Sequence, residues 1–158
     1  MKKKRRICII LSVVLCLIVG IVIFFVLNQD GKILNLDNGA VDWNGNQQLN
    51  NSSGSNGDSI SIPGFDSLVF IAGEKHQKVN FYNPPENIGC LFLMSLYVDN
   101  ILIWKSNGYV EPGKGYYDIE LAEPLESGKY QSYLHIRCFE YDGVELNSAK
   151  VTFNLFVE

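Results

Sequence analysis

The sequence predicts an all-β fold, an Ig-like antiparallel β-sandwich of about seven strands, preceded by an N-terminal transmembrane helix and a flexible stalk. Three observations lead to this prediction. An uncharged apolar run lies near the N-terminus, a polar segment rich in Asn, Ser and Gly follows it, and the last hundred residues contain short alternating runs separated by turn signals.

The apolar run extends from Ile7 to Leu27 and contains no charged residue. As a helix it would be roughly 32 Å long, about the thickness of the hydrocarbon core of a bilayer. The run is longer than the apolar part of a cleavable signal peptide, and no A-x-A pattern follows it. We therefore expect residues 7–27 to be an uncleaved signal-anchor, since a buried core helix would not explain the basic residues before it.

Five consecutive basic residues, Lys2 to Arg6, precede the run and set its orientation. Positive charge stays on the cytoplasmic side, so residues 1–6 are expected to be a cytoplasmic tail and the remainder to be extracellular. The eight basic and seventeen acidic residues after the run give the exterior a net charge of −9. Such an acidic exterior argues against nucleic acid as a partner, because binding to phosphates needs a basic face.

Residues 28–59 form the predicted stalk. Their composition, with the stretch NGNQQLNNSSGSNGDS, is poor in hydrophobic residues. A segment of this kind cannot bury enough apolar surface to order itself, so we expect a flexible linker. The stretch ILNLDNGAVDW has some apolar content that could pack locally.

Residues 60–158 have the pattern of an antiparallel β domain. Turn signals separate the runs at Asn83-Pro84-Pro85, Asp99-Asn100, Pro112-Gly113, Ser127-Gly128 and Asp142-Gly143. About a hundred residues with this punctuation are typical of a sandwich. The predicted strands include the runs CLFLMSLYV, ILIW, YYDIEL, YQSYLHIRCF and KVTFNLFV.

Alternation within two of these runs predicts which side chains face the core. Cys90 shares one face of its run with Phe92, Met94, Leu96 and Val98. Cys138 shares the apolar face of its own run, with Tyr130, Leu134 and Ile136. An extracellular location permits disulfides, so a Cys90–Cys138 bridge is the sharper hypothesis and two buried free thiols are the alternative.

Two further residues have the pattern of an immunoglobulin-type framework. Trp104 lies between the two cysteines, in the Cys–Trp–Cys order of that fold, although the spacing to the second cysteine is short. Tyr130 follows Leu125-Glu126-Ser127-Gly128, and we expect its hydroxyl to bond back to this corner.

Several stretches together resemble a family of small membrane-anchored extracellular proteins of Gram-positive, Clostridia-like bacteria. The resemblance covers about Val41 to Glu158 and implies an Ig-like exterior domain. Some relatives have cysteines at positions like Cys90 and Cys138, which favours the bridge, and some are linked to mobile or conjugative elements. The stretches are VDWNGNQ, ISIPGF, FYNPPEN, CLFLMSL, EPGK, LESGKY and RCFEYDGVELNSA.

No pattern in the sequence indicates catalysis, a cofactor or a metal site. The two histidines, His76 and His135, have no Cys or His at metal-ligand spacing, and no G-x-S-x-G, P-loop or H-E-x-x-H motif occurs. We therefore expect a protein that is not an enzyme.

A binding role follows from the order of anchor, stalk and sandwich. We expect a surface protein that presents a binding or adhesion module to a protein or glycan partner, with Tyr109, Tyr116 and Tyr117 as candidates for the contact surface. The alternative is a structural subunit of an envelope-spanning conjugation or secretion apparatus.

Overall fold

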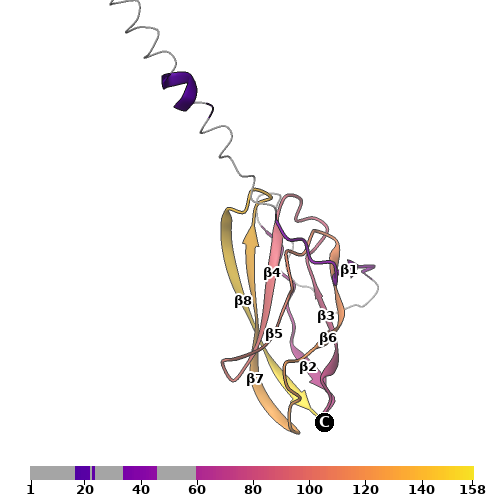
Figure 1. Cartoon of the computed structure of the whole chain (residues 1–158). Helices are drawn as coiled ribbons and strands as arrows, with labels where there is room; N and C mark the ends of the chain where they lie inside the picture. Colours follow the sequence, from indigo (N-terminus) through magenta and orange to yellow (C-terminus); the bar gives the residue numbers. More distant parts are fainter. Residues whose placement is uncertain (1–16, 22, 24–33, 46–59) are drawn as a thin grey trace, which may run out of the picture. The chain divides into compact units, whose positions relative to one another are not determined.

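The computed structural model describes residues 17–21, 23, 34–45 and 60–158, and the chain divides into two compact units, Met1–Ile33 and Leu34–Glu158 (Figure 1). In the first unit, residues 17–21 and 23 are helical. Among the residues described, no helix is long and apolar enough to cross a membrane. The basic tail, the rest of the predicted span and residues 28–33 and 46–59 of the predicted stalk lie outside the described residues.

The second unit is a β-sandwich, as the sequence predicts (Figure 1). One sheet has three strands in the order β1-β6-β3, and the other has five in the order β2-β8-β7-β4-β5. The strands are β1 (Val41–Asp42), β2 (Ser67–Phe70), β3 (His76–Tyr82), β4 (Leu91–Val98), β5 (Ile101–Lys105), β6 (Lys114–Glu120), β7 (Gly128–Phe139) and β8 (Glu145–Val157).

The turns of the five-stranded sheet have the chemistry that their sequences predict. Asp99 and Asn100 join β4 to β5 with φ angles of 47° and 67°, and two positive φ angles are the mark of a tight hairpin turn. Gly143 supplies a φ of 83° between β7 and β8. Strand β2 pairs with β8 in parallel, whereas β8-β7, β7-β4 and β4-β5 are antiparallel.

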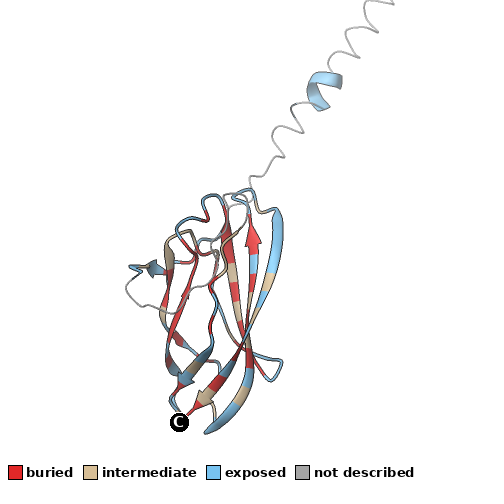
Figure 2. Cartoon of the chain, turned by 180° about the vertical axis from the view of Figure 1, so that it is seen from behind, coloured by how far each residue is buried: buried red, intermediate tan, exposed pale blue. Residues whose placement is uncertain are grey.

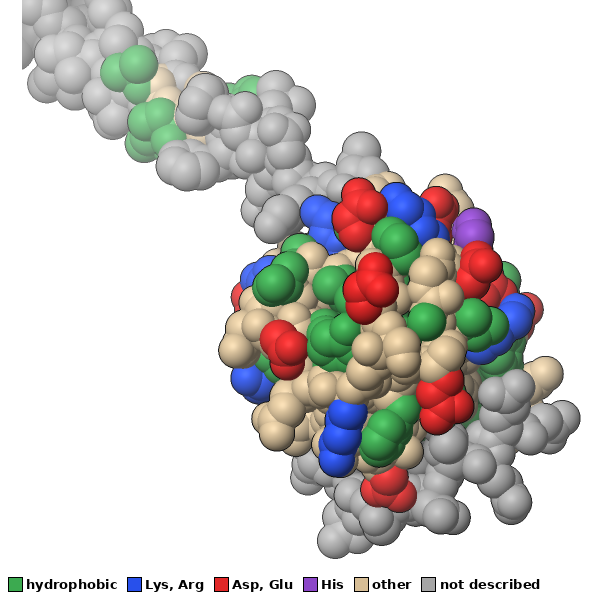
Figure 3. Space-filling model, turned by 90° about the horizontal axis from the view of Figure 1, so that it is seen from below, with side chains coloured by type: hydrophobic (Ala, Val, Ile, Leu, Met, Phe, Trp, Pro, Cys, Tyr) green, Lys and Arg blue, Asp and Glu red, His purple; other side chains and the backbone are tan. Residues whose placement is uncertain are grey.

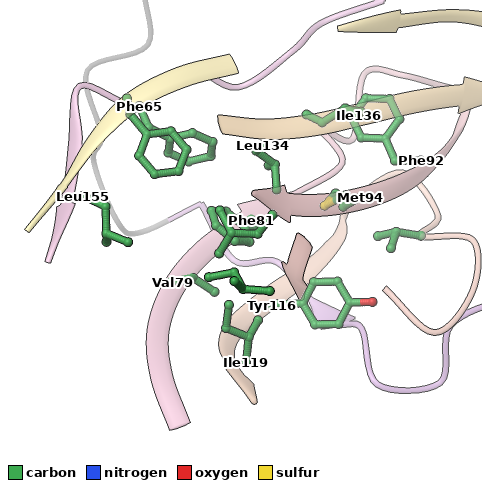
Figure 4. Packing of buried hydrophobic residues seen from close by; sticks show 14 of the residues in the cluster. Phe65, Val79, Phe81, Phe92, Met94, Tyr116, Ile119, Leu134, Ile136 and Leu155 are labelled. Atoms are coloured by element: carbon green, nitrogen blue, oxygen red, sulfur yellow. The ribbon is translucent and has the colours of Figure 1, made fainter. Parts of the chain in front are cut away.

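The core lies between the two sheets, and its side chains are those that the alternation predicts (Figure 2, Figure 4). Phe81 of β3 is fully buried and meets the ring of Phe65 edge-on at a centroid distance of 5.4 Å. All five residues on the predicted inner face of the run Cys90–Val98 are buried, as are three of the four on that of β7. These are Cys90, Phe92, Met94, Leu96, Val98, Leu134, Ile136 and Cys138.

The folded domain begins earlier than the sequence analysis places it. Residues 34–45, assigned there to the flexible stalk, belong to the compact unit, and we call them the strap. Within the strap, Val41 and Asp42 form β1 and pair with β6, and Asp37 is only 7% exposed. The stalk prediction is corrected for these residues because a polar composition does not prevent order when tertiary hydrogen bonds are available.

We predict that Phe81→Ala destabilises the domain by about 3–5 kcal/mol, because it removes a ring that packs against both sheets and leaves a cavity. Urea unfolding followed by tryptophan fluorescence measures the change. Tyr141→Ala, at a side chain that is 51% exposed, is the matched control and should change the free energy of unfolding by less than about 1 kcal/mol. Equal effects of the two variants would contradict this packing.

Candidate functional site

The strap is held by a buried carboxylate. Asp37 Oδ2 accepts hydrogen bonds from the backbone N–H groups of Asn107 at 2.7 Å and Gly108 at 3.1 Å, and Oδ1 accepts one from Gly39 N at 2.8 Å. The Tyr116 hydroxyl also donates to Oδ2. Four donors satisfy a charge that burial would otherwise make costly.

The end of the strap docks through aromatic contacts with the three-stranded sheet. Trp43 stacks on Tyr82, with ring centroids 3.9 Å apart and an interplanar angle of 5°. Its indole N–H donates to Asn80 Oδ1 at 2.9 Å. Asn44 bonds the Tyr117 hydroxyl twice, since its backbone N–H donates to Tyr117 Oη at 2.9 Å and its side-chain oxygen accepts from it at 3.0 Å. Within the stretch VDWNGNQ, Trp43 and Asn44 therefore dock the strap against the three-stranded sheet.

All three tyrosines proposed as a binding surface contact the strap. Tyr109 is half-buried, exchanges backbone hydrogen bonds with Asn35 and Asp37, and places its ring edge-on to Phe139. Tyr116 is 8% exposed, and burial together with the hydrogen bond to Asp37 raises its pKa, so its hydroxyl remains a donor. The structure does not bring the three together as an exposed surface. It uses them to bind the chain's own strap.

Gly108 is required where the strap crosses the β5–β6 connection. A Cβ atom at this position would lie 2.3 Å from the Asn35 carbonyl oxygen and 3.1 Å from Asp37 N. The backbones approach so closely that no side chain fits between them.

The NPPEN stretch forms a buried amide network that the sequence analysis did not identify. Asn83 is fully buried, and its Nδ2 donates to the carbonyl oxygens of Cys90 and Val110 at 2.8 and 2.9 Å. Asn87 donates to Asn83 Oδ1 and exchanges two hydrogen bonds with the backbone of Ser61. Two asparagines four residues apart beside a Pro-Pro turn were the only signal in the sequence, and that signal indicates a turn more readily than a network.

The predicted Cys90–Cys138 bridge is not formed. Both residues are buried free cysteines. Cys138 of β7 pairs with Phe92 of β4. Cys90 lies two residues before Phe92, just before β4 begins, so both cysteines are on the five-stranded sheet side of the core. A hydrogen bond with Cys90 and burial together raise the pKa of the Cys138 thiol, which keeps it protonated and weakly nucleophilic.

The two predicted framework residues, Trp104 and Tyr130, are held by ring packing and by a hydrogen bond, respectively. Trp104 of β5 is half-buried and meets Tyr116 edge-on at 5.0 Å and Phe81 at 5.8 Å, so it joins the margin of the core. The Tyr130 hydroxyl donates to the Glu126 carbonyl oxygen at 2.9 Å, which is the corner bond that the sequence analysis expects.

The titratable groups of the described residues do not gather into a metal-binding group of three or more His, Cys, Asp or Glu. On the outer face of the five-stranded sheet, Arg137 holds Glu145 through two hydrogen bonds of 3.0 and 2.5 Å. The bonds from Arg137 lower the pKa of Glu145. This exposed pair links β7 to β8.

No protein-family model matches the chain, and no curated protein matches its sequence.

We predict that Asp37→Asn loosens the strap, because an amide cannot accept from all four donors and carries no charge. The expected loss is about 2–3 kcal/mol, measured as faster amide hydrogen exchange in residues 34–45 of the full chain. Asp42→Asn is the control, since the Asp42 side chain is 93% exposed in its ion pair with Lys114. Gly108→Ala should reproduce the effect of Asp37→Asn, and unchanged exchange in both variants would overturn the strap assignment.

We predict that N-ethylmaleimide alkylates Cys90 and Cys138 slowly in the folded protein, because both are buried. Denaturation should then make both available as free thiols. Intact mass after treatment with N-ethylmaleimide in denaturant, without reductant, should show four additions, one for each cysteine of the chain. Two additions, with Cys90 and Cys138 in one linked peptide, would instead establish the bridge. Because a hydrogen bond with Cys90 and burial together raise the pKa of Cys138, alkylation of Cys138 in the native form should stay slow at mildly alkaline pH.

Proposed function

We propose that this chain is a single-pass, membrane-anchored surface protein whose Ig-like extracellular domain is a non-catalytic binding module for a protein or glycan. The observation that carries the proposal is the contrast between the two units. One contains an apolar helical segment with exposed side chains, and the other is a closed β-sandwich with its own core.

The anchor is supported by the apolar side chains of residues 17–21 and 23. Leu17 is 62% exposed, Ile21 is 56% exposed and Ile23 is 50% exposed, and no charged residue interrupts the surrounding run from Ile7 to Leu27. Leaving such surface in water is unfavourable by about 25 cal/mol per Å², and a bilayer removes this cost. The five basic residues before the run favour a cytoplasmic N-terminus and an extracellular sandwich.

The link between anchor and domain is short once the strap is counted with the domain. Residues 28–33 separate the apolar run from the strap. Even fully extended, the chain from Leu27 to Leu34 covers no more than about 25 Å. The stalk of the proposed surface module is therefore reduced from residues 28–59 to these six residues.

The Ig-like character is supported by strand order. A five-stranded sheet with order β2-β8-β7-β4-β5 matches an immunoglobulin sheet in which C′, C, F and G are β5, β4, β7 and β8. The pair β3 and β6 then corresponds to strands B and E of the opposite sheet. Modules of this architecture commonly bind through loops at the ends of the sandwich.

A non-catalytic role is supported by what the buried polar side chains do. Asp37, Asn83 and Asn87 bind backbone groups, as described above. Gln77 donates to the carbonyl oxygens of Ile71 and Glu74 and accepts from Ile71 N, which fixes the β2–β3 connection. The hydrogen bonds of these four side chains hold the fold.

One observation favours the alternative of a structural subunit in an envelope-spanning apparatus. Within the part of the chain that the structure describes, residues 145–153 of β8 pair only with β7, because β2 joins β8 at Asn154. An open strand edge of this length can accept a strand from another subunit. Purification from membranes in mild detergent tests this, since a stoichiometric set of membrane partners would favour the apparatus.

We predict that trypsin added to intact cells releases the sandwich from the membrane by cutting after Lys32, so that the strap stays on the released fragment. Mass spectrometry of the medium identifies the fragment. Permeabilised cells are the control for total accessibility, and a cytoplasmic protein reports leakage. Cleavage only after permeabilisation would place the domain on the cytoplasmic side and overturn the proposal.

A further inference from the structure

A groove of about 620 Å³ lies at the end of the sandwich opposite the start of the strap. The strap starts beside Tyr109, whose ring contacts Phe139 at the end of β7, whereas the groove includes Gln131 near the start of β7. Gln131 and Phe139 are eight positions apart, which corresponds to roughly 26 Å of strand. Six of the polar residues in the lining are exposed carboxylate, amide or hydroxyl side chains: Asp66, Asp99, Asn100, Gln131, Thr152 and Asn154.

Five of these six side chains have no hydrogen-bond or ion-pair partner among the residues that the structure describes, the exception being Asp99. Together they offer carboxylate acceptors, amide donors and acceptors, and a hydroxyl group. Ser132 also lines the groove, is 3% exposed, and its Oγ has no partner within the same described residues. The groove therefore gathers both donors and acceptors that the fold does not use.

Hydrogen bonds and ring contacts connect the segments that form the groove. Asp99 N donates to the Gln131 carbonyl at 2.9 Å, and Gln131 N donates to Asp99 Oδ1 at 3.3 Å, which ties the β4–β5 turn to β7. The ring of Tyr133 is stacked on Tyr97 at 4.7 Å, and Lys150 Nζ lies 3.6 Å from the Tyr133 ring centroid. A groove whose walls are fixed before binding loses little conformational entropy when a ligand enters.

The charges of the groove select among ligand classes. Asp66 and Asp99 oppose an anionic ligand, and the one lysine in the lining, Lys150, already interacts with the Tyr133 ring. Figure 3, which looks onto the end where the C-terminus lies, shows acidic, basic and apolar side chains interspersed, without a field of one sign. Carboxylate and amide groups side by side are suited to sugar hydroxyls, each of which both donates and accepts.

We infer that this groove binds a neutral oligosaccharide. The volume is within the usual range of small-ligand sites, and the edge of the half-buried Tyr133 ring provides apolar contact for the C–H groups of a sugar ring. The inference rests on the proposed function, because it names the class of glycan that the proposed extracellular binding module would take.

The test uses the full chain in phosphatidylcholine nanodiscs on an array of saccharides. Dextran, mannan, xylan and laminarin represent neutral polysaccharides, and high-mannose oligosaccharides represent neutral glycans of glycoproteins, so the two sources are distinguished. Heparin and polygalacturonate are the anionic probes, and polylysine is the basic polymer. We expect retention on at least one neutral probe, with affinity then measured by titration calorimetry.

The double variant Asp66→Ala/Asn154→Ala should weaken that binding at least about tenfold, since it removes two of the groove's polar groups. Asn147→Ala is the matched control, because Asn147 is exposed on the same strand but lies outside the groove. Both variants should keep the wild-type melting temperature. Retention on no neutral probe, retention only on heparin, polygalacturonate or polylysine, or equal binding by wild type and double variant would each overturn the inference.

The outcome is independent of the display experiment. If trypsin shows the domain to be cytoplasmic, a saccharide bound in the groove still stands as a measured property. If the domain is displayed and binds no neutral saccharide, only this inference fails.

Discussion

The carboxylate of Asp37 is the point on which the arrangement of the domain depends. Asp37 accepts hydrogen bonds from the strap, from the β5–β6 connection and from β6, and so joins the strap to segments 70 and 79 residues further along the chain. A buried charge is stable only while its donors stay in place. The position of the strap, the close approach of Gly108 to the strap backbone and the orientation of Tyr116 therefore depend on one another. A change in any one of them would alter the other two.

This constraint alters the meaning of the tyrosines. Tyrosines near Pro-Gly loops of an extracellular sandwich are reasonable candidates for a contact surface, and sequence alone gives no way to see that the chain provides its own partner. Tyr116 and Tyr117 are neighbours on β6, so their side chains point to opposite faces of the sheet. One binds Asp37 on the inside and the other binds Asn44 on the outside, which means that the strap contacts both faces.

The sequence predicts the parts of the fold that depend on local pattern. Alternation identifies the inner faces of β4 and β7, and Asp99-Asn100 and Asp142-Gly143 identify hairpins, because both signals arise from neighbouring residues. Pairings across long separations are not visible in this way. Asp37 lies 70 residues from Asn107, and the two strap residues of β1 have no hydrophobic period to reveal them. Of the groove, only the Asp99-Asn100 turn could be found from sequence, since its other residues come together through strand register.

Because Cys90 and Cys138 are free, non-covalent contacts must connect the two sheets in this region, whereas an immunoglobulin domain has a disulfide between its sheets. That bridge connects strands B and F across the core, whereas Cys90 and Cys138 both belong to the same sheet region. Here Asn83, directly after β3, reaches across to the carbonyl oxygens of Cys90 and Val110, which precede β4 and β6. Phe81 of β3 and Trp104 of β5 add a contact between sheets. An amide network and an aromatic contact thus connect the two sheets in this region without a covalent link.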